Sequence, residues 1–224
     1  MQLSLRNIYH FFRDAGRTII RRELDSPDLI ILDQKKAVYA SVAKSACSSI
    51  KTAITQPPPD GVAIHDYISH LSRRRIPKNK RSYYVFTFVR DPYDRLSSCY
   101  RSKFNMEDES NFIYSNYLFG YLRNEDTFDQ FVRKVCRIPD FLSDRHFKSQ
   151  NKIVFSPGTN VEYIGKVENL PADFDSLKEK FGFLDLTHRY KTSGKTSDEL
   201  YTNETREMVY KRFSKDFEVF NYSK

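Results

Sequence analysis

Apolar and polar positions alternate in a way that divides the chain into short strand-like runs and helix-like runs. Aromatic and β-branched residues fill 37–41 and 83–89, as is typical of buried strands, and a helix-compatible segment follows each. Further strands are predicted over 152–155 and 161–164. Further helices are predicted over 64–71, 128–135, 171–181 and 202–217. This alternation predicts an α/β fold with a central parallel sheet in a three-layer sandwich.

The first 35 residues have a different pattern. Leu5, Ile8, Phe12, Ala15 and Ile19 recur at helical spacing among several arginines, which predicts an amphipathic basic helix. Such a helix either packs on its own domain or contacts an anionic membrane surface or a partner. We therefore expect a single domain over 1–224, with an amphipathic N-terminal helical region over 1–35 and the core over 36–224.

Composition narrows the class of protein. The chain has 224 residues, 39% of them hydrophobic, which suits one α/β domain, and its formal net charge of +8 favours anionic ligands. Cys47, Cys99 and Cys136 form neither a disulfide framework nor a zinc pattern, and we expect no metal. No stretch approaches a membrane span of about 20 apolar residues. Two basic clusters, at 73–75 and 78–81, match no nucleic-acid motif, so we expect no nucleic-acid partner.

An anion-binding loop is predicted over residues 42–50. They follow the strand-like run 37–41 and combine one lysine with small hydroxyl residues at the start of a helix. Backbone N–H groups at a helix N-terminus lack partners, and the helix dipole favours negative charge there. Lys44 adds a point charge, while Ser48 and Ser49 add hydroxyl donors. A phosphate-like group would fit this loop.

A second strand–turn–helix signal spans 86–100. Pro92 suits a first helical turn, and Arg90 ends the strand, where open α/β sheets contact their ligands. Ser98 follows about two helical turns later. Two such anion sites suggest one ligand that carries phosphates at two places.

Residues 44–49 resemble the 5′-phosphosulfate loop of sulfotransferases that use 3′-phosphoadenosine 5′-phosphosulfate (PAPS). Arg90 and Ser98, within V-R-D-P-Y-D-R-L-S-S-C-Y-R-S-K-F, resemble the 3′-phosphate motif of the same family. The branch that the chain resembles is the carbohydrate sulfotransferases that include the chondroitin 4-O and HNK-1 enzymes, from about residue 38 onward. Animal members carry a Golgi anchor. This chain departs from that pattern, so we expect a cytoplasmic bacterial homologue in polysaccharide biosynthesis.

The resemblance implies that PAPS is the sulfuryl donor, that adenosine 3′,5′-bisphosphate (PAP) is the product, and that a carbohydrate is the acceptor. The positive net charge of the chain would favour an acidic carbohydrate. Lys44 would stabilise the leaving phosphate. The other donor-binding residues implied are Ser45, Ala46, Cys47, Ser48, Ser49, Arg90, Ser98, Lys191, Thr192 and Lys195. The last three belong to a loop similar to the one that closes over the nucleotide in related enzymes.

The general base is expected to be a histidine, because imidazole suits proton removal near neutral pH. Related enzymes place a catalytic histidine between the two phosphate motifs, which favours His65 and then His70. His146 is a third candidate and would line the acceptor cleft with Arg145. Asp66 and Glu107 are alternative carboxylates.

Two other functions stay open at this point. The basic clusters allow a non-catalytic protein that binds polyanions or glycans. A P-loop nucleotide kinase is the other alternative, but its loop requires G-x-x-x-x-G-K-[ST], and residues 42–50 contain no glycine. The acceptor and the oligomeric state are not encoded in any motif we identified.

Overall fold

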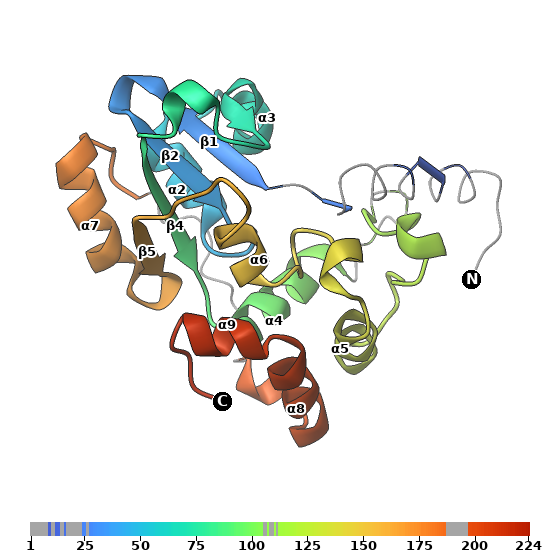
Figure 1. The fold of residues 1–224 in the computed structure, drawn as a ribbon. Coiled ribbons are helices and arrows are strands. Elements are labelled where there is room, and N and C mark those ends of the chain that lie inside the picture. The colour runs from blue at the N-terminus through green and yellow to red at the C-terminus, as the bar shows by residue number, and fades with distance from the viewer. Residues whose placement is uncertain are drawn as a thin grey trace. The chain divides into compact units, whose positions relative to one another are not determined.

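The computed structural model describes residues 27–104, 107, 110, 112–186 and 197–224, together with 9, 12, 13, 16, 24 and 25. The chain forms two compact units. The sheet unit comprises Pro27–Asp91 and the segment from Gln150 to Gly194, and the helical unit comprises Met1–Ser26, Pro92–Ser149 and Lys195–Lys224. Figure 1 labels most of the helices and strands of both units.

A five-stranded sheet in the order β3-β1-β2-β4-β5 forms the centre of the sheet unit. The strands are β1 (Asp28–Leu32), β2 (Ala37–Ser41), β3 (Ser72–Arg73), β4 (Tyr84–Val89) and β5 (Tyr163–Lys166). β2, β4 and β5 are parallel, whereas β1 runs antiparallel to β2 and β3. The expected parallel core is thus confirmed, and the sheet as a whole is mixed.

Strand β1 lies inside the range 1–35 that the sequence pattern assigned to a helical region. Its residues Leu29 to Leu32 are all buried, and the strand pairs along its whole length with β2. The sheet therefore begins at Asp28, eight residues before the expected start of the core at 36. The expected helical residues Leu5, Ile8, Ala15 and Ile19 lie outside the part of the chain that the structure describes.

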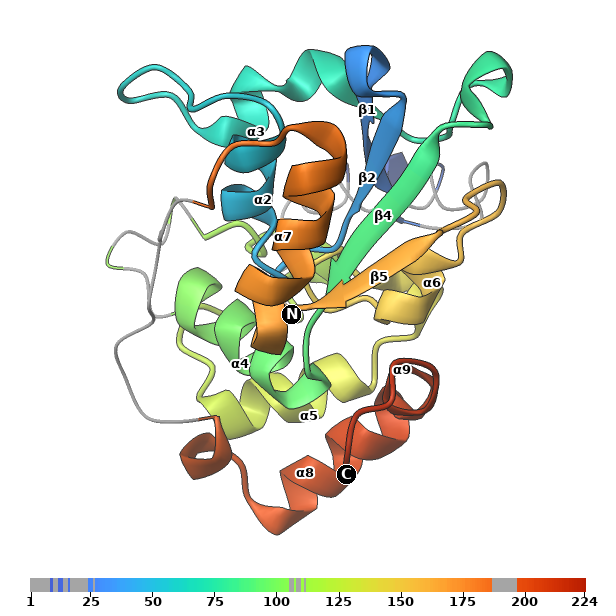
Figure 2. The same cartoon turned by 90° about the vertical axis from the view of Figure 1, so that its left-hand side faces the viewer.

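Helices cover both faces of the sheet. On one face α2 (Cys47–Ile54), α3 (Ile64–Tyr67) and α7 (Leu170–Phe181) bury apolar side chains against the rings of Tyr39, Phe86 and Phe88. Figures 1 and 2 place the short α6 (Gln150–Val154) on the opposite side of the sheet from α2 and α7. The three-layer α/β architecture is therefore confirmed.

Two sequence-based assignments are wrong. Residues 152–155 were expected to form a strand, but Lys152 to Val154 belong to α6. Burial of Ile153 and Val154 and the hydrogen bonds of Gln150 outweigh the strand propensity of the two β-branched residues. The expected terminal helix over 202–217 is broken at Phe213 into α8 (Asn203–Arg212) and α9 (Ser214–Val219).

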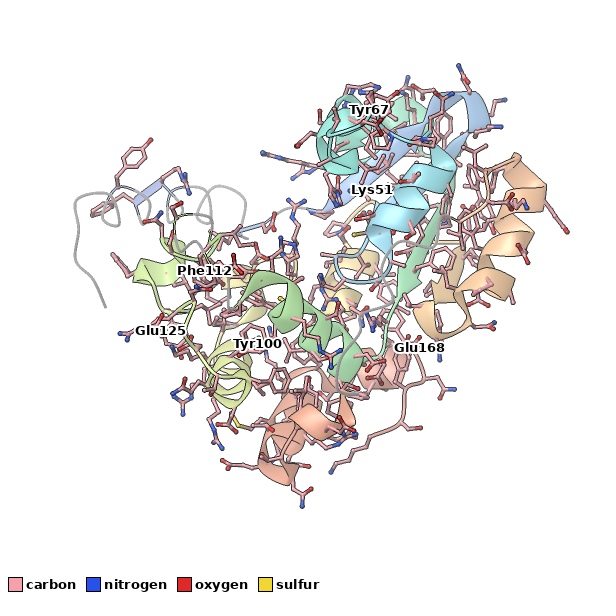
Figure 3. The ribbon with its side chains drawn as sticks, turned by 180° about the vertical axis from the view of Figure 1, so that it is seen from behind. Lys51, Tyr67, Tyr100, Phe112, Glu125 and Glu168 are labelled. Carbon is pink, nitrogen blue, oxygen red and sulfur yellow. The ribbon has the colours of Figure 1, made fainter. Side chains whose placement is uncertain are left out.

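The helical unit contains α4 (Pro92–Lys103), α5 (Phe128–Cys136), α8 and α9 around an aromatic core. Figure 3 labels Tyr100 and Phe112 in this core, where both rings lie against Phe104, with centroids 5.3 and 5.2 Å away. The guanidinium of buried Arg95 donates to the carbonyls of Lys148 and Arg145, at 2.8 and 2.9 Å. Arg95 is therefore a structural residue of this unit. Among the helices described, none has the length and apolarity to cross a bilayer.

Candidate functional site

The loop between β2 and α2 has the backbone of an anion site. Lys44 (φ +67°) and Ala46 (φ +55°) both adopt the left-handed conformation, which side chains other than glycine rarely take. Backbone N–H groups in alternating right- and left-handed conformations line a concave nest that binds anions. The loop that the sequence predicts to bind phosphate thus takes up two left-handed residues without any glycine.

The start of α2 adds further donors to the same loop. Ala46 is the N-cap residue, and no side chain caps the helix. The N–H groups of Cys47, Ser48 and Ser49 have no acceptor within the helix, because the first hydrogen bond from α2 to the loop is made by Ile50 to Ala46. The positive end of the helix dipole lies at the same place. Charge and donors therefore both favour a bound anion.

Lys44 and Arg90 follow the carboxyl ends of two neighbouring parallel strands. β2 and β4 pair in the register Ala40 to Thr87, and the Thr87 hydroxyl donates to the Ala40 carbonyl at 2.6 Å. Parallel neighbours end at the same edge of a sheet, where open α/β sheets bind ligands. Both side chains are half-buried. The loop after β2 and the turn after β4 are thus adjacent, as the sequence analysis required for one ligand at two strand ends.

Gln150, the first residue of α6, joins these two turns. Its side-chain Oε1 accepts from Arg90 N (2.9 Å) and from Ser45 Oγ (3.4 Å), and its Nε2 donates to Arg90 O (2.7 Å). The side chain is completely buried. Sequence reasoning missed Gln150, because no local signal marks a residue that acts 60 and 105 positions away in the chain.

The third parallel strand contributes a carboxylate to the same edge. Glu168, which is labelled in Figure 3, is the second residue after β5, and its Oε1 accepts from Asp91 N at 2.7 Å. Side chains from two different segments therefore hold this turn. Gln150 bonds the backbone of Arg90, and Glu168 bonds the backbone of Asp91.

His65, which the sequence analysis placed first as base, lies against the first turns of α2. Its Nε2 is 3.3 Å from Ser48 Oγ, and its Nδ1 is 3.0 Å from Lys51 Nζ. Lys51 is buried and forms an ion pair with Asp28 at 2.6 Å. An ammonium group only donates hydrogen bonds, so Nδ1 is the acceptor and the proton of the neutral ring lies on Nε2.

His70 has the opposite arrangement. Its Nδ1 lies 3.2 Å from the carbonyl oxygen of Tyr67, which can only accept a hydrogen bond. Nδ1 therefore carries the proton, and the lone pair of the neutral ring lies on Nε2. Of the two histidines expected to act as base, His70 has its basic nitrogen away from the backbone, while His65 has its basic nitrogen against a lysine.

Three further predicted residues, Ser98, Arg145 and His146, lie in the helical unit. Ser98 lies on α4 and is 9% exposed. The guanidinium of Arg145 binds both carboxylate oxygens of Asp25, at 2.8 and 2.6 Å. His146 Nδ1 donates to Asp144 at 2.6 Å. Burial alone would raise the pKa of Asp144, but the hydrogen bonds and positive charge of His146 lower it below its usual value.

The remaining predictions concern exposed or undescribed positions. Asp66 and Glu107 are exposed. Lys191, Thr192 and Lys195 lie outside the described residues. Within the described ranges, no cluster of three or more His, Cys, Asp or Glu side chains could hold a metal ion.

Comparison with known proteins places the chain in a family. Residues 27–223 match the sequence model described as the Sulfotransferase family. Carbohydrate sulfotransferase 12 of Xenopus laevis is 26% identical over an alignment covering 92% of this chain and 62% of the relative. Carbohydrate sulfotransferase 11 of Mus musculus is 25% identical over 89% of this chain and 68% of the relative. Carbohydrate sulfotransferase 14 of Homo sapiens is 24% identical over an alignment covering 73% of this chain and 47% of the relative.

The chain thus spans less than two thirds of the length of the Xenopus relative. No solved structure gave a significant match. The family match covers the loop after β2, the turn after β4 and nearly the whole chain. The chain belongs to the Sulfotransferase family.

Proposed function

We propose that this chain is a sulfotransferase that moves a sulfuryl group from PAPS to a hydroxyl group of a carbohydrate. The observation that carries the proposal is the arrangement at one edge of the sheet. Two left-handed residues and the uncapped start of α2 follow β2, and Arg90 follows the neighbouring parallel strand β4. Family membership supplies the reaction class, and the names of the relatives point to a carbohydrate acceptor.

The reaction is an in-line displacement at sulfur. A bond forms between the acceptor oxygen and sulfur, the bond between sulfur and the 5′-phosphate oxygen breaks, and PAP leaves. Negative charge develops on the bridging oxygen, so a fixed positive charge there lowers the barrier. Lys44 has this role in our proposal, and the N–H groups of 47–49 hold the 5′-phosphate.

Arg90 is the residue we assign to the 3′-phosphate, since a planar guanidinium binds phosphate through two parallel hydrogen bonds. Gln150 hydrogen-bonds both the N–H and the carbonyl of Arg90, which fixes the backbone of this residue in the turn after β4. A role for Ser98 in binding the same phosphate is supported by the resemblance of its motif alone.

The proton of the acceptor hydroxyl goes to a general base. We assign this role to His70 rather than to His65, because, of these two, His70 has the hydrogen-bonding pattern that leaves Nε2 as a proton acceptor. His65→Ala and His70→Ala then separate the two assignments. The variant that lacks the base should have a turnover number lower by about 10²-fold or more, with an unchanged affinity for PAP.

Thermal unfolding with added nucleotide tests the proposal. PAP should raise the melting temperature more than AMP or ATP, because a ligand that binds only the native state stabilises it. Lys44→Ala should abolish transfer of labelled sulfate from PAPS, while the control Lys78→Ala, an exposed lysine outside the strand edge, should retain it. Equal responses to all three nucleotides, with binding that weakens steeply with salt, would instead indicate a polyanion-binding protein.

A further inference from the structure

We propose that Lys51 is a positioning residue which holds His65 as an N–H donor, so that His65 and Ser48 form a relay of donors toward the anion at the loop. The pattern of hydrogen bonds stands on the structure alone. Only the identity of the anion, the 5′-phosphosulfate, rests on the function proposed above.

The relay begins at a buried ion pair. Lys51 is 3% exposed, and its Nζ lies 2.6 Å from Asp28 Oδ2. The other carboxylate oxygen, Oδ1, accepts from Ser72 Oγ at 2.6 Å. Both oxygens of Asp28 are thus engaged, which fixes the carboxylate and with it the position of the ammonium group. Figure 3 labels Lys51 on α2 and Tyr67 on α3, the helix that also carries His65.

The direction of each hydrogen bond follows from the chemistry of the groups. Lys51 Nζ has no lone pair to accept with, so at 3.0 Å it donates to His65 Nδ1. The neutral ring then has its proton on Nε2, 3.3 Å from Ser48 Oγ. Ser48 Oγ accepts this hydrogen bond through a lone pair, which leaves its own hydroxyl hydrogen to donate to the anion at the loop. Ser48 is the second residue of α2, among the N–H groups that no side chain caps.

This arrangement opposes the uptake of a second proton by His65. An imidazolium would turn its Nδ1–H toward the Lys51 ammonium, so that two positive donors would face one another across 3.0 Å. Asp28 is the carboxylate that contacts Lys51, while Asp66 is the chain neighbour of His65 and is exposed. We infer that His65 strengthens anion binding through Ser48 and does not act as the base.

The tautomer of His65 can be measured directly. Long-range ¹H–¹⁵N spectra of the full chain at neutral pH should show His65 Nδ1 as an unprotonated nitrogen and Nε2 as a protonated one, with assignment from His65→Gln. Lys51→Met should shift the ring toward a mixture of tautomers, and Lys51→Arg, which keeps a donor, should restore the original pattern. An Nδ1–H tautomer or an imidazolium in the unsubstituted protein would overturn the proposal.

A double-substitution cycle tests whether Lys51 acts through Ser48. Lys51→Met and Ser48→Ala should each weaken PAP binding about 10-fold, and the double variant should lose little more than either single one. Thr55→Val, at the end of the same helix, is the control for general loosening of α2. Fully additive losses would exclude the relay.

Kinetics separate this role from a base. With His65→Gln the KM for PAPS should rise while kcat falls less than 10-fold, whereas loss of a base would lower kcat with KM unchanged. If PAP does not bind the unsubstituted chain, the proposed function fails, and the tautomer spectra still test the relay.

Discussion

Gln150 and Arg90 are joined by a closed pair of hydrogen bonds. The side-chain Nε2 of Gln150 donates to the Arg90 carbonyl at 2.7 Å, and its Oε1 accepts from the Arg90 N–H at 2.9 Å. A side-chain amide thus takes the place of a neighbouring strand at the point where β4 ends. The backbone of the residue that we assign to the 3′-phosphate is therefore set by a helix more than fifty residues later in the chain.

Gln150→Ala should lower the free energy of unfolding by about 2–4 kcal/mol, because it removes a fully buried side chain and both of its hydrogen bonds to the half-buried backbone of Arg90. It should also weaken PAP binding, since the turn at Arg90 is released. Urea unfolding and a nucleotide titration measure the two effects. Asn151→Ala, a half-buried neighbour on α6, is the control and should cost less than about 1 kcal/mol. Equal losses from both variants would show that the amide has no special role.

Ala46→Gly should stabilise the fold. Ala46 has φ +55°, and the left-handed conformation costs a residue with a side chain about 1–2 kcal/mol. Glycine avoids this cost but loses about 0.5–1 kcal/mol more conformational entropy on folding. A net gain of about 0.5–1 kcal/mol is expected in denaturant melts. Ala53→Gly, in the buried interior of the same helix, should instead destabilise by about 1 kcal/mol. A loss of stability from Ala46→Gly would argue against the left-handed loop.

Gly165→Ala should destabilise the sheet unit through a clash with Phe88. A Cβ at position 165 would lie 2.3 Å from Phe88 Cε1, on a ring that is buried between β4 and α7. Overpacking of this kind costs about 1–3 kcal/mol. Adding Phe88→Leu should recover part of the loss by making room, and a double-substitution cycle measures that recovery. Ile164→Ala, exposed on the same strand, should have a much smaller effect.

The ion pair of Asp140 and Arg212 should make stability depend on pH in the acid range. Burial raises the pKa of Asp140, but the hydrogen bond and charge of Arg212, 2.7 Å away, outweigh it and lower the pKa below its usual value. A carboxylate with a lowered folded-state pKa stabilises the fold above its unfolded pKa, and this stabilisation is lost as pH falls below about 4.

Asp140→Asn should therefore reduce the loss of stability between about pH 5 and pH 2, measured by denaturant unfolding across that range. Asp60→Asn, in an exposed loop, serves as the comparison and should leave the slope unchanged. A slope in Asp140→Asn equal to that of the unsubstituted chain would contradict the assignment.

Local signals predicted the elements that build the candidate site. Aromatic and β-branched residues marked β2 and β4, Pro92 marked the start of α4, and Gly182 marked the end of α7, where it adopts φ +63°. These features act within a few residues, through side-chain shape and allowed backbone angles, so they can be identified without the fold. The placement of Lys44 and Arg90 at strand ends followed from the same reasoning.

Contacts between distant segments decided the rest. The sequence predicted a strand where α6 lies, because nothing nearby shows that Gln150 would satisfy a backbone turn 60 positions earlier. The sequence also favoured His65 as base, whereas its tautomer depends on Lys51, and Lys51 in turn on Asp28 from β1. Hydrogen-bond direction and burial are properties of the folded neighbours of a group, so residue type alone identifies the candidates for a role, and tertiary structure determines which role each can take.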